Sequence, residues 1–332
     1  WPAPAACKLR ARPQGLRKLL ATLIVGVAIV LAFVLPGYQL FRATSAIAYA
    51  IAVLGLNLLT GYNGQISLGH GAFYAIGGYT TAILMADFAV PYWLTVPVSA
   101  ALCGCFGFLL GFPALRLGGV YLALTTFATA VAVPQILKSS YLEGWTGGVQ
   151  GIVISKPDPP FDLPLTADQW LYLFSLALAL ALFLVAYNLV TGRTGRALIA
   201  IRDHALAAEA MGVNTALVKT GVFAVSALYT GIAGSLGAIA VEFVSPDSFT
   251  VLLSIVLFVG LVAGGIASIL GPVFGGLFIV FVPAVAEGIS KAAPDAVYGL
   301  ILIGFMYLMP FGIAGFVESL ILRISASEGG GE

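Results

Sequence analysis

Residues 43–86 read ATSAIAYAIAVLGLNLLTGYNGQISLGHGAFYAIGGYTTAILMA, forty-four positions without one Asp, Glu, Lys or Arg. The hydrocarbon core of a bilayer is about 30 Å thick, and a helix needs roughly twenty apolar residues to span it. This stretch is therefore long enough to cross a membrane twice. Its middle, residues 57–71, gathers glycines and neutral polar side chains, which is where the chain can turn between two helices.

Seven more uncharged stretches of at least twenty-one residues occupy most of the remaining chain. The longest, residues 248–286, has thirty-nine positions and a Gly- and Ser-rich break at residues 264–272, so it also fits two crossings. A composition of 60% hydrophobic and 9% charged residues excludes a disordered chain and argues against a water-soluble domain. We predict an all-α, polytopic integral membrane protein with about ten transmembrane helices. The six stretches that fit one crossing each are residues 19–41, 88–115, 117–137, 169–192, 220–241 and 296–317.

The basic residues predict the orientation of these helices. Five of the first eighteen residues are Lys or Arg, so the positive-inside rule places the N-terminal segment, residues 1–18, in the cytoplasm. Ten crossings also place the tail, residues 318–332, in the cytoplasm, with eleven basic residues on that side against four outside. One misplaced helix would invert the later loops and remove this asymmetry. The four basic residues expected outside are Arg42, Lys138, Lys156 and Lys291.

A cleaved signal peptide is the alternative interpretation of the basic start and the apolar residues 19–35. This apolar segment is long for a signal core, and no small-residue cleavage site follows it. We therefore expect a retained first helix and a transmembrane domain that extends over residues 19–317.

Two connections between the predicted helices are long and polar. Residues 138–168 contain the run KPDPP at 156–160 and are expected to form an extracytoplasmic loop stiffened by proline. Residues 191–219 lie on the cytoplasmic side and show the three- and four-residue apolar spacing of an amphipathic helix. Such a helix lies at the membrane surface or docks on a partner. Its predicted apolar face comprises Leu198, Ile201, Ala205, Ala208 and Met211, and its other faces carry Arg196, Arg202, Asp203 and Glu209.

The two breaks share a pattern that is weak evidence of an internal duplication. Each has a glycine, a serine three residues later, another glycine within three more, and then a phenylalanine, Phe73 or Phe274. Both breaks are expected at the cytoplasmic side in the same orientation, which suits a parallel repeat. The inverted repeats common in transporters would require a different pairing, and the sequence leaves this choice open.

Polar groups at membrane depth are tolerated only where they are buried in protein or line a cavity. The breaks are therefore the best candidates for the ends of a translocation path, with Asn57, Ser67, Gly69, His70 and Ser268 as candidate path residues. The alternatives are an interhelical hydrogen bond for Asn57 and a packing role for His70. No acidic residue lies inside a predicted span, apart from Glu287 at the end of one, which argues against ion-coupled transport and for an energy source outside this chain.

Several short blocks of sequence, in order along the chain, have counterparts in one transporter family. These blocks are LGLNLL at 54–59, GY at 61–62, SLGH at 67–70, PALRL at 113–117, TGG at 146–148, GI at 151–152, GRAL at 195–198, AIRD at 200–203, AAEAMG at 207–212 and VSPDSF at 244–249. Over residues 43–310 the chain thus resembles the Liv-type permeases, the membrane subunits of ATP-binding-cassette importers for branched-chain amino acids.

The resemblance implies partners and roles that the residues alone leave open. Such permeases pair with a second permease, two cytoplasmic ATPase subunits that bind ATP and Mg, and an extracytoplasmic solute-binding protein. Residues 196–214 then look like the helix that couples to the ATPases, with Glu209 and Gly212 matching the Glu and Gly of the family's short coupling motif. Met211 departs from that motif, which has a second alanine there. The full set of implied coupling residues is Arg196, Arg202, Asp203, Glu209 and Gly212.

On the outer side, Ser245 and Asp247 are candidate contacts for the binding protein. The alternative is that Pro246 only shapes a turn, with Asp247 and Ser248 capping the next helix.

Other kinds of chemistry lack the residues that they need. The chain has no Gly-Lys-Thr or Gly-Lys-Ser phosphate loop, and its two histidines are far apart, so we expect no ATP hydrolysis, no metal and no cofactor in this chain. Nucleic acid is an unsuitable partner because the net charge is only +1. We therefore expect a permease of a bacterial inner membrane that carries an aliphatic amino acid. Urea or a short amide is the alternative solute, and a stand-alone channel or secondary carrier is the rival class.

Overall fold

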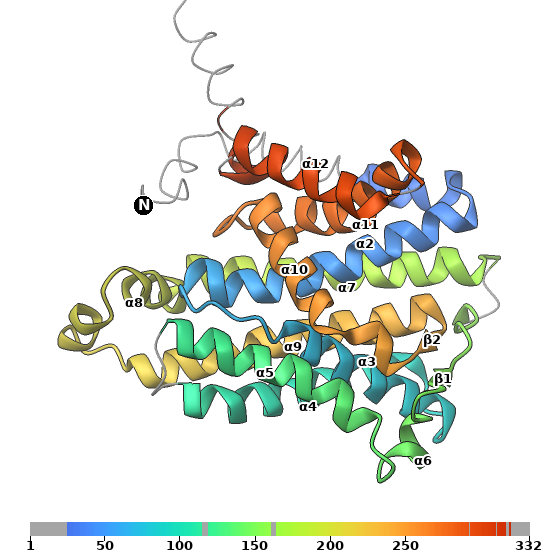
Figure 1. The fold of residues 1–332 in the computed structure, drawn as a ribbon, viewed down its shortest axis with the longest axis horizontal. Coiled ribbons are helices and arrows are strands. Elements are labelled where there is room, and N and C mark those ends of the chain that lie inside the picture. Colours follow the sequence, from blue (N-terminus) through green and yellow to red (C-terminus); the bar gives the residue numbers. More distant parts are fainter. Residues whose placement is uncertain are drawn as a thin grey trace, which may run out of the picture.

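The computed structural model describes residues 25–114, 119–160, 164–291, 293–309 and 311–316, together with residue 319. The basic segment at residues 1–18, Arg116 and Arg323 lie outside the described residues, so the structure does not bear on their predicted placement. The described chain is all-α apart from one pair of two-residue strands, which confirms the all-α part of the predicted fold class (Figure 1).

A short apolar helix, Val25–Val34, precedes α2. The α-helices are α2 (Gly37–Leu56), α3 (His70–Ala86), α4 (Tyr92–Ala114), α5 (Val120–Leu137), α6 (Glu143–Thr146), α7 (Ala167–Thr191), α8 (Arg193–Ala210), α9 (Thr215–Val241), α10 (Val251–Gly264), α11 (Gly271–Ile289) and α12 (Pro294–Leu308). Two short non-α helices complete the helical elements: the π-helical η2 (Asn57–Tyr62) and the 3₁₀-helical η4 (Pro246–Phe249). The two strands are β1 (Ile152–Val153) and β2 (Phe243–Val244).

Seven helices of the described chain are long and apolar enough to cross a membrane. Three more of the predicted crossings coincide with shorter helices: Val25–Val34, α10 and the 17-residue α3. The helix α3 is short because it starts only at His70, after the irregular residues 63–69 of the first break. The helix α10 is short because it starts only after η4. Both uncharged stretches that were long enough for two crossings thus divide into two helices at their Gly- and Ser-rich breaks.

The helix α9 forms the centre of the bundle and packs against α2, α3 and α4 (Figure 1). Small residues allow this approach: a Cβ atom on Gly77 of α3 would collide with the backbone of Gly231 in α9. Next to this contact, the Thr81 hydroxyl lies within hydrogen-bonding distance of Ser99 and Ser235, at 2.9 and 2.6 Å. Close backbone contact and shared hydroxyls hold membrane helices together because lipid supplies no hydrophobic drive for their association.

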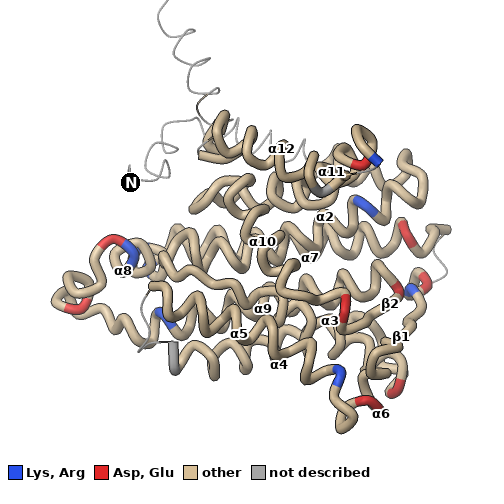
Figure 2. The backbone as a smooth tube through the Cα atoms, viewed as in Figure 1, with Lys and Arg blue, Asp and Glu red and all other residues tan. Residues whose placement is uncertain are grey.

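Charged residues gather at the two opposite ends of the bundle (Figure 2). One end carries α8, and the other carries α6, β1 and β2. At the second end β1 and β2 pair antiparallel, with Ile152 opposite Val244. There Lys156 also forms an ion pair with Asp168 at 3.0 Å and lies 3.9 Å from Glu242. The loop at residues 138–168 and the turn after α9, which were expected on the same side, are therefore in direct contact.

Candidate translocation and coupling site

Asn57 joins the two breaks. It is fully buried where α2 continues into η2. Its Nδ2 donates a hydrogen bond to the carbonyl oxygen of Ser268 (2.8 Å), and its Oδ1 accepts one from the backbone N–H of Ala267 (2.9 Å). Ala267 has a φ of 58°, a left-handed conformation that costs free energy for a residue with a Cβ atom. The side chain of Asn57 therefore holds the second break in a strained shape; its hydrogen bonds go to the non-helical backbone between α10 and α11 and not to another helix.

Gly61 lies in the narrow space between Asn57 and Ala267. A Cβ atom at this position would collide with the Oδ1 atom of Asn57 and would lie 2.8 Å from the backbone nitrogen of Ala267. Sterics therefore explain the glycine of the GY block: only glycine at position 61 lets η2 approach the second break this closely.

Arg202 connects α8 to the same place. Its Nη1 donates a hydrogen bond to the carbonyl oxygen of Gly61 (3.0 Å), and its Nε donates to Asp203 (3.3 Å). The aliphatic part of the Arg202 side chain also packs against Gly64, which has a φ of 73°. One continuous set of contacts thus runs from α8 through Arg202 and Gly61 to Asn57 and the second break.

The connection at residues 191–219, predicted as one cytoplasmic helix, is divided in the structure. The helix α8 has a kink at His204 (φ −157°, ψ 92°) and ends at Ala210, and the residues after 214 already belong to α9. Met211 is 85% exposed and lies at the C-cap of α8, just after the helix ends, so it does not continue the buried face of α8. The chain leaves the helix at this point, and the 3.6-residue period no longer applies. The rest of the predicted face is buried at Leu198, Ile201 and Ala208 and half-buried at Ala205.

Glu209 and Gly212 shape the turn from α8 to α9. Gly212 has a φ of 85°, and its N–H donates to the carbonyl oxygen of Glu209 (2.9 Å), as in the usual glycine ending of a helix. The Glu209 carboxylate accepts a hydrogen bond from the Thr215 hydroxyl at the start of α9. Arg196 and Asp203 lie exposed on α8. The structure thus gives Glu209 and Gly212 a role inside the chain, and their contact with an ATPase stays a prediction.

His70 starts α3 deep inside the bundle. Its Nε2 lies 2.7 Å from the hydroxyl of Ser226, and its Nδ1 lies 3.2 Å from the hydroxyl of Ser67. Ser226 is eleven residues after Thr215, so this contact lies about 16 Å along α9 at 1.5 Å per residue. The helix α3 therefore starts part-way along the bundle, beside the middle of α9.

The hydrogen bonds around His70 define its tautomer. Ser226 donates its only hydroxyl hydrogen to the carbonyl oxygen of Gly55 (2.6 Å), so it accepts from His70 Nε2–H. In the neutral ring, Nδ1 is then the acceptor, and Ser67 donates to it. Both ring nitrogens of His70 thus have protein partners, and the side chain is only 1% exposed. This arrangement matches the packing alternative, and a role for Ser67 or His70 in a path stays a prediction.

Three hydroxyl residues that the sequence patterns did not single out complete the first break. Thr126 accepts from the N–H of Leu68 (3.0 Å), Ser254 accepts from the N–H of Gly71 (2.9 Å), and Ser226 bonds to His70 as described. A Cβ atom on Gly69 would lie 2.9 Å from the backbone of Thr126, so glycine is required there as well. Free N–H groups at a helix start need acceptors, and within a membrane the protein must supply them. Serines and threonines in apolar helices were the available signal, but most of them bond within their own helix.

On the opposite end, Asp247 forms an ion pair with Lys138, and its side chain is 62% exposed. The hydroxyl of Ser245 lies 3.1 Å from that of Ser248. Pro246 starts η4, so it does shape a turn, but the N-cap of α10 is Thr250, with no side-chain cap bond. The capping role considered for Asp247 and Ser248 is therefore wrong, because η4 separates them from α10. Contact with a binding protein stays a prediction.

Comparison with known proteins identifies the family. Residues 38–309 match the family described as "Branched-chain amino acid transport system / permease component". The chain is 32% identical to the high-affinity branched-chain amino acid transport system permease protein LivM of Escherichia coli K12, over 80% of this chain and 67% of that protein. It is 25% identical to the permease protein LivH of Salmonella typhimurium LT2, over 84% of this chain and 96% of that protein. No solved structure matches the chain.

The chain spans about two thirds of the length of the LivM relatives that it matches, 67% in Escherichia coli and 64% in Salmonella typhimurium. The family match covers both breaks, α8 and the outer loops. A permease component is a transport subunit and not itself an enzyme. Together with seven helices able to span a bilayer, this shows that the chain is a multi-pass membrane protein. It belongs to the family of permease components of branched-chain amino acid transport systems.

Proposed function

We propose that this chain is one of two permease subunits of a bacterial ATP-driven importer, and that its solute is a small aliphatic amino acid. The family match and the names of the LivM and LivH relatives support this solute class. The relatives include two kinds of permease, which supports a heteromeric pair in the membrane. Two ATPase subunits, which bind ATP and Mg, and an extracytoplasmic binding protein complete the proposed complex.

The proposed topology has ten crossings with the N-terminus in the cytoplasm of an inner-membrane protein. The seven long helices, α3, α10 and the helix Val25–Val34 supply the ten segments. Alternating crossings place α8 and both breaks at the inner end and Lys138, Lys156 and Lys291 at the outer end. The contacts support this, since Arg202 bonds to the first break, and the outer loops pair through β1 and β2.

The observation that carries the proposal is the connection of α8 to both breaks. ATP-driven movement of the partner ATPases reaches α8 as a rigid-body displacement. Arg202 transmits this displacement to Gly61, and Asn57 transmits it to the backbone of Ala267 and Ser268. Both breaks then move together, which opens or closes the inner end of the path to the solute.

The test is L-leucine uptake by the complete transporter in proteoliposomes, with and without ATP inside. We expect ATP-dependent leucine uptake by the wild type. Arg202→Ala should lower the leucine imported per ATP hydrolysed, whereas Arg193→Ala, an exposed charge on the same helix, should leave this ratio unchanged. Equal ratios in the two variants would rule out the transmission role of Arg202.

The same preparation separates the rival functions. Uptake of urea in place of leucine would assign the chain to transport of short amides. Leucine flux at the wild-type rate from a preparation lacking the ATPase subunits would assign it to a channel or secondary carrier.

A further inference from the structure

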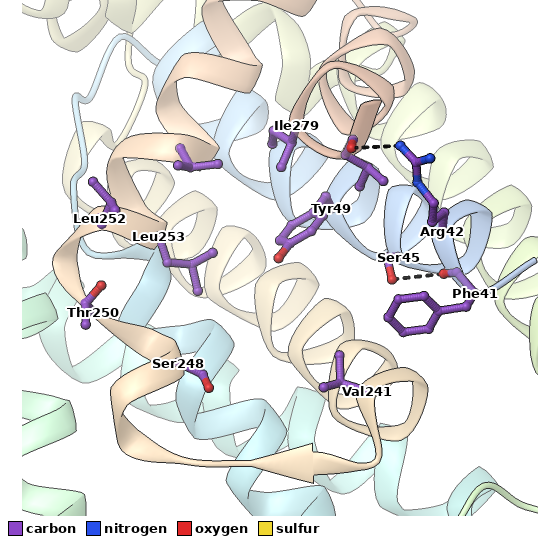
Figure 3. Close-up of a pocket in the computed structure, with 12 residues that line it drawn as sticks. Phe41, Arg42, Ser45, Tyr49, Val241, Ser248, Thr250, Leu252, Leu253 and Ile279 are labelled. Atoms are coloured by element: carbon purple, nitrogen blue, oxygen red, sulfur yellow. Dashed lines mark hydrogen bonds between the residues drawn. The ribbon is translucent and has the colours of Figure 1, made fainter. Parts of the chain in front are cut away.

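An open pocket of about 430 Å³ lies between α2, α10 and α11, towards the outer end of the bundle (Figure 3). Its position follows from its walls, which include Val241 at the end of α9 and Ser248 in η4. None of the path residues chosen from the sequence lines it. Figure 3 shows Arg42 and Ser45 on the α2 side, Ser248 and Thr250 on the opposite side, and the Tyr49 hydroxyl pointing into the space between them.

Among the described residues, Arg42 is the only charged one that lines this pocket, and these residues use few of the N–H donors of its guanidinium group. It makes one long hydrogen bond, from Nη2 to the carbonyl oxygen of Val280 (3.4 Å), and lies over two aromatic rings, 4.6 Å from the centroid of Phe281 and 5.8 Å from that of Tyr38. Within the described residues no carboxylate lies within ion-pair distance of Arg42. A guanidinium has five N–H donors, so most of them are free to bind an anion.

The rest of the lining suits the other parts of an amino acid. In the described part of the chain, the Tyr49 and Thr250 hydroxyls make no hydrogen bond to protein, and the Ser45 hydroxyl, which donates to Phe41, still has lone pairs to offer. These oxygens can accept hydrogen bonds from an ammonium group. Leu253, Val256 and Ile279 supply an apolar wall for an aliphatic side chain.

We propose that this pocket binds the zwitterion of an aliphatic amino acid in the outward-facing transporter, with the carboxylate on Arg42 and the aliphatic side chain on α10 and α11. This inference rests on the proposed function and gives it a solute site. The carboxylate of an amino acid satisfies the planar, bidentate geometry of a guanidinium. Urea carries no charge and would leave Arg42 without a counter-ion, so the pocket selects against it.

The test uses a diazirine-bearing photoreactive leucine with the complete transporter in phosphatidylcholine vesicles without ATP. Irradiation and peptide mapping should place the label, which the diazirine on the aliphatic side chain forms, on α10 and α11, at or next to Leu253 and Ile279. An excess of L-leucine should prevent the labelling, and L-leucinamide, which has no carboxylate, should not. Labelling elsewhere in the chain, or equal protection by leucinamide, would overturn the proposal.

Substitutions of single basic residues provide the controls. Arg42→Ala should lower the labelling about ten- to a hundredfold, the usual effect of removing a hydrogen bond to a charged group. Arg42→Lys keeps the charge but not the bidentate fork, so its labelling should lie between that of the wild type and that of Arg42→Ala. Lys291→Ala removes an exposed basic residue outside the pocket and should label like the wild type. Basal ATP hydrolysis by each variant shows that the complex is folded and assembled, and wild-type labelling of Arg42→Ala would contradict the proposal.

Two further experiments complete the test. The first shows whether a lipid or an amino acid binds Arg42, and the second separates failure of the pocket proposal from failure of the proposed function. If a lipid phosphate occupied Arg42, adding phosphatidylglycerol to the vesicles would abolish the labelling, and that result would assign the pocket to lipid. Normal leucine import and normal labelling by Arg42→Ala would show that the pocket is not the leucine site, but would leave the proposed function intact. Import of urea and not leucine by the wild type would instead remove the proposed function.

Discussion

The inner breaks and the outer pocket differ in how completely the protein satisfies its own polar groups. At the inner breaks, Asn57 uses both ends of its amide, and His70 uses both ring nitrogens, all with protein partners. At the outer pocket, Arg42 has one long hydrogen bond, and Tyr49 has none to the described protein. The contrast teaches that polar groups in this bundle have two uses: the buried inner set fixes backbone shape, and the half-buried outer set is, in our proposal, available to a solute.

The largest effect is expected from adding one methyl group at the inner breaks. Gly61→Ala places a Cβ atom against Asn57 and Ala267, so it should separate the breaks and abolish leucine uptake by the reconstituted complex. Gly221→Ala adds the same atom to α9, where nothing lies within 4 Å, and should transport normally. Wild-type uptake by Gly61→Ala would show that the breaks do not need this close contact.

A large effect is also expected from removing the amide that joins the breaks. Asn57→Leu leaves the Ser268 carbonyl and the Ala267 N–H without a partner, and each lost hydrogen bond costs about 1–3 kcal/mol when the remaining group is buried. Thermal unfolding of the detergent-solubilised complex should start at a clearly lower temperature, with leucine uptake reduced. Asn188→Leu, at an exposed position of α7, is the matched control. An unchanged unfolding temperature would contradict the bridging role of Asn57.

A smaller effect is expected at His70. Ser226→Ala removes the hydroxyl that bonds both His70 and the Gly55 carbonyl, and should destabilise the protein by about 1–3 kcal/mol without ending transport. Ser175→Ala removes an equally buried hydroxyl that has no partner, and should be neutral or stabilising. Thermal unfolding of the two variants side by side measures the difference. Equal stabilities would mean that the hydrogen bonds of Ser226 contribute nothing.

The smallest effect is expected at the exposed outer ion pair. Lys138→Ala breaks the contact with Asp247, which is worth about 1 kcal/mol or less at an exposed site and weakens as salt rises. Stability measured at low and high salt should differ more in the wild type than in the variant. A loss of stability as large as that of Asn57→Leu would contradict the small contribution expected of this exposed ion pair.

The sequence predicted the parts of the fold that depend on hydrophobicity. The uncharged stretches gave the all-α class, and the Gly- and Ser-rich segments gave the places where two of them divide. It did not predict that α3 starts part-way along the bundle, because that depends on Thr126 and Ser254, which come from helices far along the chain. Nor did it predict the kink at His204 or the exposure of Met211, since apolar spacing carries no signal for a helix end inside a short connection.

The candidate site was predicted unevenly for the same reason. Asn57 and Arg202 were chosen as polar residues at a break and on a charged helix face, but their connection through Gly61 depends on three segments meeting in space. Arg42 was used only to assign the outer side. Its position in a pocket follows from the packing of α10 and α11 against α2, for which no local pattern in the sequence exists.

The most direct measurement of the central claim is the distance between α8 and the second break during the ATP cycle. Spin labels at Ala200 and Ile266, both exposed, report this distance by pulsed electron paramagnetic resonance in the complete transporter. If Arg202, Gly61 and Asn57 transmit movement as a rigid connection, the distance stays the same in the nucleotide-free and vanadate-trapped states of the wild type and changes in Arg202→Ala. A wild-type distance that changes between the two states would show that α8 and the breaks move independently, and would contradict the account.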